Sequence, residues 1–139
     1  GIRDHHYVDM LDYSKEAIKN ALLWVFNNSH KPFVIHCMGG KDRTGVLAAL
    51  LLKSLKVANS TILEDYLHSR AAIYDFIDKM CQKQNKPFEE LMKPSYDVNE
   101  SALNNVLDQL DSLMDPKDPF SWLGIKKEAF LHFRKNVIL

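Results

Sequence analysis

The most chemically distinctive pattern in this chain is a cysteine followed, after five intervening residues, by an arginine. Two glycines lie between Cys37 and Arg43, and a strongly apolar stretch follows at residues 46–52. A loop of this composition over a helix N-terminus points its backbone N–H groups inward, where they and the helix dipole hold a dianionic phosphate without a metal. The planar guanidinium of Arg43 can bond two phosphate oxygens at once. The residues expected to surround the phosphate are Met38, Gly39, Gly40, Lys41, Asp42 and Arg43.

The same arrangement predicts a reactive thiol at Cys37. A free thiol has a pKa near ~8.5, which a helix N-terminus and nearby cations lower, and the resulting thiolate can attack phosphorus to form a phosphocysteine. Thr44 can donate its hydroxyl to the sulfur and help it leave in the second step. We expect His36 to support the loop through hydrogen bonds rather than to act as a base. Gly45, like the two loop glycines, suits a position of close approach or positive φ.

The window HCMGGKDRTG at residues 36–45 resembles the signature His-Cys-x5-Arg-Thr/Ser-Gly of the protein-tyrosine-phosphatase superfamily. Its GKDRTG ending is most similar to the tyrosine and phosphoinositide phosphatases of that superfamily. The stretches ILEDYLHS at 62–69 and WLGI at 122–125 are also similar to these enzymes, so the likeness covers nearly the whole chain. The resemblance implies an α/β fold with a parallel sheet flanked by helices. It also implies hydrolysis of phosphotyrosine or phosphoinositide monoesters without a cofactor.

The resemblance further implies a carboxylic acid that protonates the leaving oxygen. In the superfamily this acid is an aspartate well before the cysteine, and Asp4 has a similar spacing, with Asp9 and Asp12 as weaker candidates. In the GKDRTG group the residue matching Asp42 is itself a candidate, and its alternative role is to fix the loop geometry through a neighbouring cation or N–H group. Lys41 can bond extra phosphates on an inositol ring, as in the resembled lipid phosphatases, or remain a solvated charge at the pocket mouth.

The composition predicts an ordinary globular domain over residues 1–139, with 46% hydrophobic residues. Eighteen basic and eighteen acidic residues cancel, so no global charge favours nucleic acid or an anionic membrane. The apolar run at 46–52 is too short to span a bilayer, although peripheral membrane contact is compatible with the sequence. Two cysteines make no disulfide framework, and a nucleophilic Cys37 must stay reduced, which favours the cytoplasm.

The periodicity of apolar residues predicts a mostly helical chain. We expect helices from about 15 to 28, 43 to 56, 59 to 70, 73 to 80, 99 to 114 and 125 to 138, and a loop over residues 1–13. The segment 33–36 is predicted to be a buried strand that precedes the phosphate loop. One strand cannot form a sheet, because its backbone groups need neighbours.

The resemblance implies that a further N-terminal segment supplies those neighbouring strands. This chain would then be the C-terminal part of the fold, with the missing segment in the same chain or in another one, unless the strand is satisfied in some other way. The alternative function is a catalytically inactive module that binds phosphate or phosphoinositide.

Overall fold

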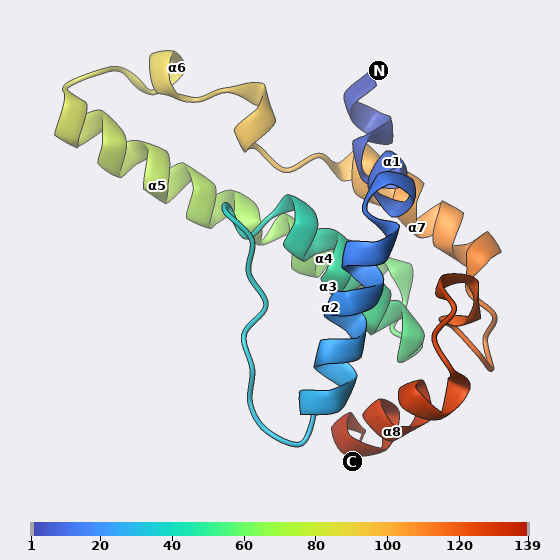
Figure 1. The fold of residues 1–139 in the computed structure, drawn as a ribbon. Coiled ribbons are helices and arrows are strands. Elements are labelled where there is room, and N and C mark those ends of the chain that lie inside the picture. The colour runs from blue at the N-terminus through green and yellow to red at the C-terminus, as the bar shows by residue number, and fades with distance from the viewer. Residues whose placement is uncertain (1, 139) are drawn as a thin grey trace.

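The computed structural model describes residues 2–138, and almost all of this part of the chain is helical (Figure 1). The predicted helices are found, with small shifts of their ends, and Gly1 and Leu139 lie outside the described residues. The α-helices are α1 (His6–Tyr13), α2 (Lys15–Asn28), α3 (Asp42–Ser54), α4 (Asn59–Leu67), α5 (Ser69–Gln84), α6 (Phe88–Leu91), α7 (Glu100–Leu113) and α8 (Lys127–Val137). Three 3-10 turns accompany them, η1 (Ile2–His5), η2 (Pro94–Tyr96) and η3 (Ser121–Leu123).

Helix α7 lies at the centre of the fold. Asn99 caps its N-terminus, where the side-chain oxygen accepts a hydrogen bond of 3.0 Å from the N–H of Ala102. Its inward face, with apolar residues at helical spacing, is buried against η1, α1, α3 and α4. The helix that begins at the phosphate loop, α3, is therefore seated directly on the core. The buried residues of this face are Leu103, Val106, Leu107 and Leu110.

Helices α2 and α8 pack together through aromatic side chains. The rings of Phe26 and Phe133 are stacked with centroids 4.9 Å apart, and Phe120 lies 5.5 Å from Phe26 on another side. Offset aromatic pairs of this kind add to the stabilisation that burial alone provides. This cluster joins the last helix of the chain to α2.

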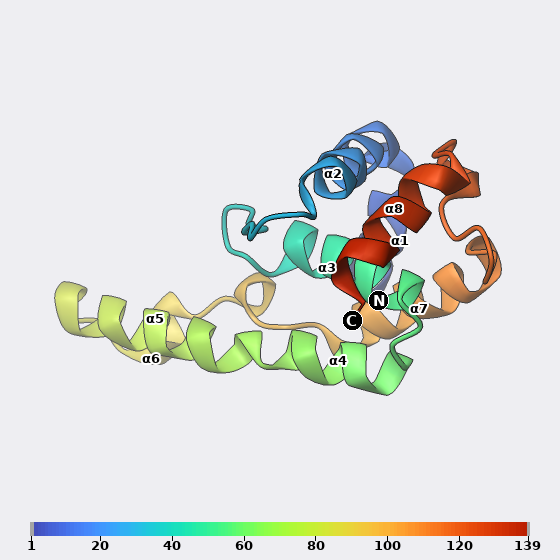
Figure 2. The same cartoon turned by 90° about the horizontal axis from the view of Figure 1, so that it is seen from below.

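Helix α5 projects away from the body of the molecule, as both views show (Figure 1, Figure 2). Helix α6 and the chain that follows it return beside α5, where the rings of Tyr74 and Phe88 meet at 5.4 Å. Ile77 is the residue of α5 that is fully buried. None of the helices in residues 2–138 combines the length and the apolar character needed to cross a membrane.

The loop predicted for residues 1–13 is wrong for the part that the structure describes, because η1 and α1 occupy it. Tyr7, Met10 and Leu11 are all buried against the core. Their spacing of three and four residues is the helical pattern, which the intervening histidines and aspartates obscure in the sequence. The early chain is therefore a packed element of the fold.

The strand predicted at residues 33–36 is also wrong, and no parallel sheet is found within residues 2–138. The side chains do alternate as in a strand, since Phe33 and Ile35 pack partly against the core while Val34 is 83% exposed. A strand nevertheless requires a hydrogen-bonded neighbour, and no second extended segment pairs with this one in the described part of the chain. Residues 33–36 are therefore an extended segment without a paired strand, in an otherwise largely helical structure.

Candidate active site

The predicted phosphate loop lies between the extended segment and α3, which begins at Asp42, one residue before the expected start. Gly40 adopts the left-handed conformation, with φ of +67°, that residues with a Cβ seldom reach. The chain can therefore turn so that the N–H groups of Gly40, Lys41 and Thr44 all face the sulfur of Cys37. The expected cradle of backbone donors is thus assembled at the N-terminus of a helix.

The Cys37 thiol is acidic in this setting. Burial by itself raises its pKa, but hydrogen bonds from the Thr44 hydroxyl and from the three backbone N–H groups outweigh burial and lower the pKa to about 6. The oxygen of the Thr44 hydroxyl, however, is buried and meets no partner in the described chain when strict hydrogen-bond geometry is required. The amides are fixed by the backbone, so we attribute the lowered pKa of Cys37 mainly to them. Cys37 is therefore mainly a thiolate at neutral pH.

The outer rim of the loop faces solvent. Arg43 is exposed, and it forms no ion pair within residues 2–138, so its guanidinium can meet an anion. Met38 is also exposed, and a Cβ added to Gly39 would meet no atom within 4 Å. His36 Nδ1 lies 3.3 Å from the carbonyl oxygen of Cys37, which fits a role in supporting the loop.

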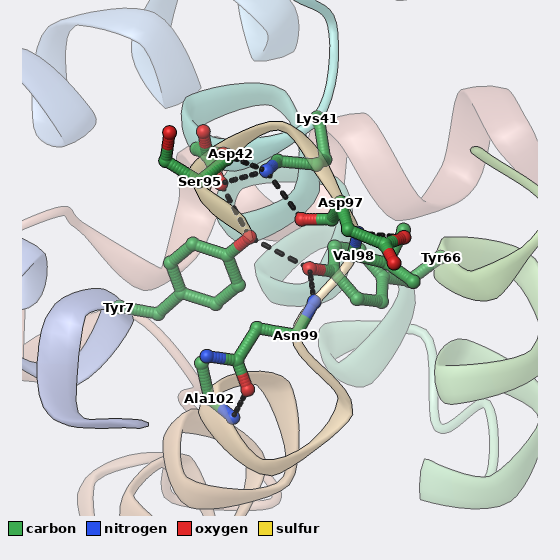
Figure 3. Close-up of polar contacts among 9 residues, drawn as sticks. All are labelled: Tyr7, Lys41, Asp42, Tyr66, Ser95, Asp97, Val98, Asn99 and Ala102. Carbon is green, nitrogen blue, oxygen red and sulfur yellow. Dashed lines mark hydrogen bonds and ion pairs between the residues drawn. The ribbon is translucent and has the colours of Figure 1, made fainter. Parts of the chain in front are cut away.

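Lys41 points into the protein (Figure 3). The sequence predicts instead either contact with a further phosphate of the substrate or a solvated charge at the pocket mouth. The residue is only 6% exposed, and Nζ donates hydrogen bonds of 2.9 Å and 2.7 Å to the carbonyl oxygens of Ser95 and Asp97. Nζ also lies 3.4 Å from Asp42 Oδ1. The ammonium group is therefore neither solvated nor directed at a second phosphate, and it fastens the loop to the segment before α7.

Asp97 continues this connection toward α5. Its carboxylate accepts hydrogen bonds of 3.0 Å from Arg70 Nε, 3.2 Å from the Tyr74 hydroxyl and 2.7 Å from the Val98 N–H. Burial opposes ionisation, but these donors lower the pKa of Asp97 below its usual value. The loop, the segment at 95–97 and α5 thus form one polar unit.

Asp42 is held by Tyr7, which in turn meets Tyr66, and neither tyrosine was among the predicted site residues (Figure 3). The hydroxyl of Tyr7 donates to Asp42 Oδ1 at 2.5 Å, and the hydroxyls of Tyr7 and Tyr66 are 2.7 Å apart. The N–H of Asn99 donates to the Tyr66 oxygen at 2.8 Å. Burial and then the Asp42 hydrogen bond raise the pKa of Tyr7, so this phenol keeps its proton. Recognition of helix α1 from its buried positions would have marked Tyr7 as a core residue, but no local pattern in the sequence links it to Asp42.

Gly45 lies in the first turns of α3, against the ring of Tyr66. A Cβ at this position would come within 3.2 Å of Tyr66 Cδ2, which is tighter than ordinary packing. The absence of a side chain at Gly45 therefore makes room for the Tyr66 ring, while its role in supporting the loop stays a prediction.

The other candidate acids lie in different surroundings. Asp9 shares a hollow of about 320 Å³ with Asp42, whereas Asp12 lines a separate one beside Trp122. Asp4 Oδ1 accepts a 3.3 Å hydrogen bond from the side chain of Asn99. Among these aspartates, Asp42 is the one built into the phosphate loop. The hollow beside it is lined by His6, Tyr7, Asp9, Lys41, Asp42, Ser95 and Asn99.

Comparison with known proteins identifies the family of this chain. The model of a family described as the tyrosine phosphatase family matches residues 2–138. The chain belongs to the tyrosine phosphatase family. No solved structure matches the chain.

Curated relatives of this tyrosine phosphatase family member share shorter stretches with it. The inositol diphosphatase DSP2 of Arabidopsis thaliana is 36% identical over 66 residues, which are 48% of this chain and 24% of the relative. The triple specificity protein phosphatase PtpB of Mycobacterium tuberculosis is 30% identical over 64 residues, covering 46% and 23%. A putative tyrosine-protein phosphatase of Cupriavidus necator is 54% identical over 39 residues, or 28% and 14%. The aligned parts thus span a quarter or less of each of these relatives.

Proposed function

We propose that this chain carries the nucleophile and phosphate loop of a cysteine-dependent phosphatase that hydrolyses phosphate monoesters. The observation that carries the proposal is the Cys37 thiol, whose pKa is lowered to about 6 by donors at the start of α3. In this proposal the same amides donate to phosphate oxygens, and the exposed Arg43 bonds two more. Nucleophile and anion cradle therefore come from one short segment.

In the proposed first step, Cys37 Sγ attacks phosphorus as the bond from phosphorus to the ester oxygen breaks. The leaving oxygen takes a proton from Asp42, while Arg43 and the loop amides stabilise the oxygens of the transition state. In the second step a water oxygen attacks the phosphorus of the phosphocysteine while the Asp42 carboxylate takes a proton from that water, which restores the acid. The bond from phosphorus to sulfur breaks, the sulfur leaves as a thiolate with help from the Thr44 hydroxyl, and inorganic phosphate is released. The thiolate is restored, so the cycle needs no cofactor.

The proposed substrates are phosphotyrosine proteins, phosphoinositides, or both. The names of the relatives support this range, because they include an inositol diphosphatase and a triple specificity protein phosphatase. A phosphoinositide substrate would require peripheral contact with a membrane, and a reduced Cys37 favours the cytoplasm. The proposal includes a complementary strand-forming segment beside residues 33–36, whose side chains already alternate as in a strand.

The test is phosphate release from a panel of phosphotyrosine peptides and phosphoinositides, measured with and without EDTA. We expect turnover by the wild-type protein, no effect of EDTA, and no turnover by Cys37→Ser, which should still bind phosphate through the intact cradle. Cys81→Ser, which changes a cysteine on α5, is the matched control and should keep full activity. Phosphate binding without release by the wild-type protein would instead support the alternative of an inactive phosphate-binding module.

A further inference from the structure

The hydrogen bonds that end at Asp42 run in one direction. A backbone N–H can only donate, so the N–H of Asn99 makes the oxygen of Tyr66 an acceptor. Tyr66 then has one proton, and the hydroxyl of Tyr7, 2.7 Å away, is the acceptor within reach. Tyr7 in turn gives its single proton to Asp42 Oδ1 at 2.5 Å. The amide at the start of α7 thereby sets the polarity of the whole chain of bonds (Figure 3).

This polarity decides which oxygen of Asp42 can carry a proton. A protonated Oδ1 could accept only weakly from Tyr7, because the oxygen of a neutral carboxylic O–H is a poorer acceptor than a carboxylate oxygen. If it donated to Tyr7 instead, Tyr7 would have to donate to Tyr66. The Tyr66 oxygen would then accept from both Tyr7 and Asn99, and neither of these two bonds would use its own proton. A buried donor without a partner is costly. Lys41 Nζ, 3.4 Å from the same oxygen, opposes a proton there as well.

We propose that Tyr7 is a positioning residue that reserves Oδ1 of Asp42 as an acceptor, so that Oδ2 carries the proton given to the leaving group. The assignment rests on the proposed phosphatase function and names the atom that would serve it. Within the described residues Oδ2 has no hydrogen-bond partner, and the Asp42 side chain is 39% exposed and lines the hollow of about 320 Å³. The reserved oxygen thus faces the protein, and the other one is open to a substrate.

The two tyrosines are rigidly placed for this role. Tyr7 on α1 is almost fully buried, and its ring meets that of Tyr66 on α4 edge to face, with centroids 6.0 Å apart. A Cβ at Gly45 would stand 3.2 Å from Tyr66 Cδ2, so the glycine leaves room for this ring to lie close to α3, which carries Asp42. Contacts among α1, α3 and α4 therefore fix the direction of the Asp42 carboxylate.

The kinetic test compares Tyr7→Phe with Tyr13→Phe, the same chemical change at an exposed position on the same helix. General acid catalysis matters for a poor leaving group and contributes about 100- to 10,000-fold to the rate. Tyr7→Phe should leave the Asp42 carboxyl misplaced and remove part of this contribution, so kcat for an alkyl phosphate should fall by about 10- to 100-fold. Hydrolysis of p-nitrophenyl phosphate should change less than about threefold, and KM should stay constant for both substrates. Tyr13→Phe should match wild type.

Two further measurements separate positioning from general damage. The double variant Tyr7→Phe/Asp42→Asn should be no slower on the alkyl phosphate than Asp42→Asn alone, because both changes remove one function. In proton NMR spectra the Tyr7 hydroxyl should give a slowly exchanging downfield signal that disappears in Tyr7→Phe and moves upfield in Asp42→Asn. If Tyr7→Phe does not fold, the Asp42→Asn spectrum still shows whether the Tyr7 hydroxyl bonds to Asp42. Tyr66→Phe is a second variant that should also move the signal.

The proposal is overturned if Tyr7→Phe slows both substrates equally, if its effect adds to that of Asp42→Asn, or if the downfield signal is the same in wild type and Asp42→Asn. Absence of Cys37-dependent turnover in the wild-type protein would instead defeat the phosphatase function, and with it the role of Oδ2. The NMR result does not depend on turnover, so the two failures are distinguishable.

Discussion

The ammonium nitrogen of Lys41 lies 2.7 Å from the carbonyl oxygen of Asp97, a residue 56 positions further along the chain. The contact is nearly inaccessible to solvent, because Lys41 is 6% exposed. A buried ammonium needs partners of this kind, and here two carbonyls and the Asp42 carboxylate supply them. The position of the loop between Cys37 and Arg43 is therefore set by a cation within the loop itself.

Replacing this cation should loosen the loop. Lys41→Met keeps the length of the side chain but leaves two carbonyl oxygens without their donor, so unfolding in urea should show a loss of about 2 kcal/mol. Lys86→Met, at an exposed ion pair with Glu90, is the control and should change stability by less than about 0.5 kcal/mol. Unchanged stability of Lys41→Met together with selective loss of phosphoinositide hydrolysis would contradict the fastening role and favour contact with substrate.

The acidity of Cys37 can be measured by its alkylation with iodoacetamide in the Cys81→Ser background. The thiolate is the reactive form, it is present above the pKa, and it is lost as pH falls through about 6. The alkylation rate should therefore rise from pH 5 to 7 and then level off, with half its maximum near pH 6. A midpoint near that of an ordinary thiol, ~8.5, would show that the loop donors do not act on the sulfur.

Arg43→Lys should reduce catalysis with little effect on stability. A lysine ammonium cannot reproduce the bidentate contact, and contacts to the developing transition-state charge are worth a factor on the order of 100 to 1,000. Because the native side chain is exposed and makes no ion pair in the part of the chain that the structure describes, the urea midpoint should stay constant. Arg134→Lys, an exposed change on α8, should leave kcat/KM unaltered. A fall of less than about twofold in Arg43→Lys would mean that the guanidinium does not reach the phosphate.

Gly45→Ala should destabilise the protein although it lies in a helix. A helical glycine replaced by alanine ordinarily gains about 1 kcal/mol, but here the new Cβ would stand 3.2 Å from the Tyr66 ring. We expect the displaced ring to reverse the sign, giving a loss of about 1 kcal/mol in urea unfolding. Gly39→Ala, which meets no atom within 4 Å, is the stability control. A gain in stability for Gly45→Ala would show that the ring yields freely.

Features that depend on neighbouring residues could be predicted from the sequence. The buried positions of α7 repeat at helical spacing over its whole length, and Asn99 stands where a cap is needed, so this helix follows from local pattern. The loop between Cys37 and Arg43 follows from its glycines and from the helix after it. Both are determined by short-range chemistry that a sequence displays directly.

Contacts between distant segments could not be predicted in this way. Tyr7 reaches Asp42 across 35 positions, and its own helix was hidden by polar residues between the buried ones. The direction of the Lys41 side chain likewise depends on carbonyl groups far along the chain. The extended conformation at 33–36 reflects local preference, but a strand is a property of two segments, and residues 2–138 contain only one of them.

The unpaired segment at 33–36 also bears on how the protein behaves in concentrated solution. Within the described residues its backbone N–H and C=O groups pair with no other strand, so they can pair with another molecule. The exposed side chain of Val34 adds an apolar surface beside them. The formal charge of the chain is +0, so long-range repulsion does little to keep two copies apart near neutral pH. Self-association should therefore begin at residues 33–36. A charged residue in place of Val34 should raise solubility more than a charged residue placed on any helix.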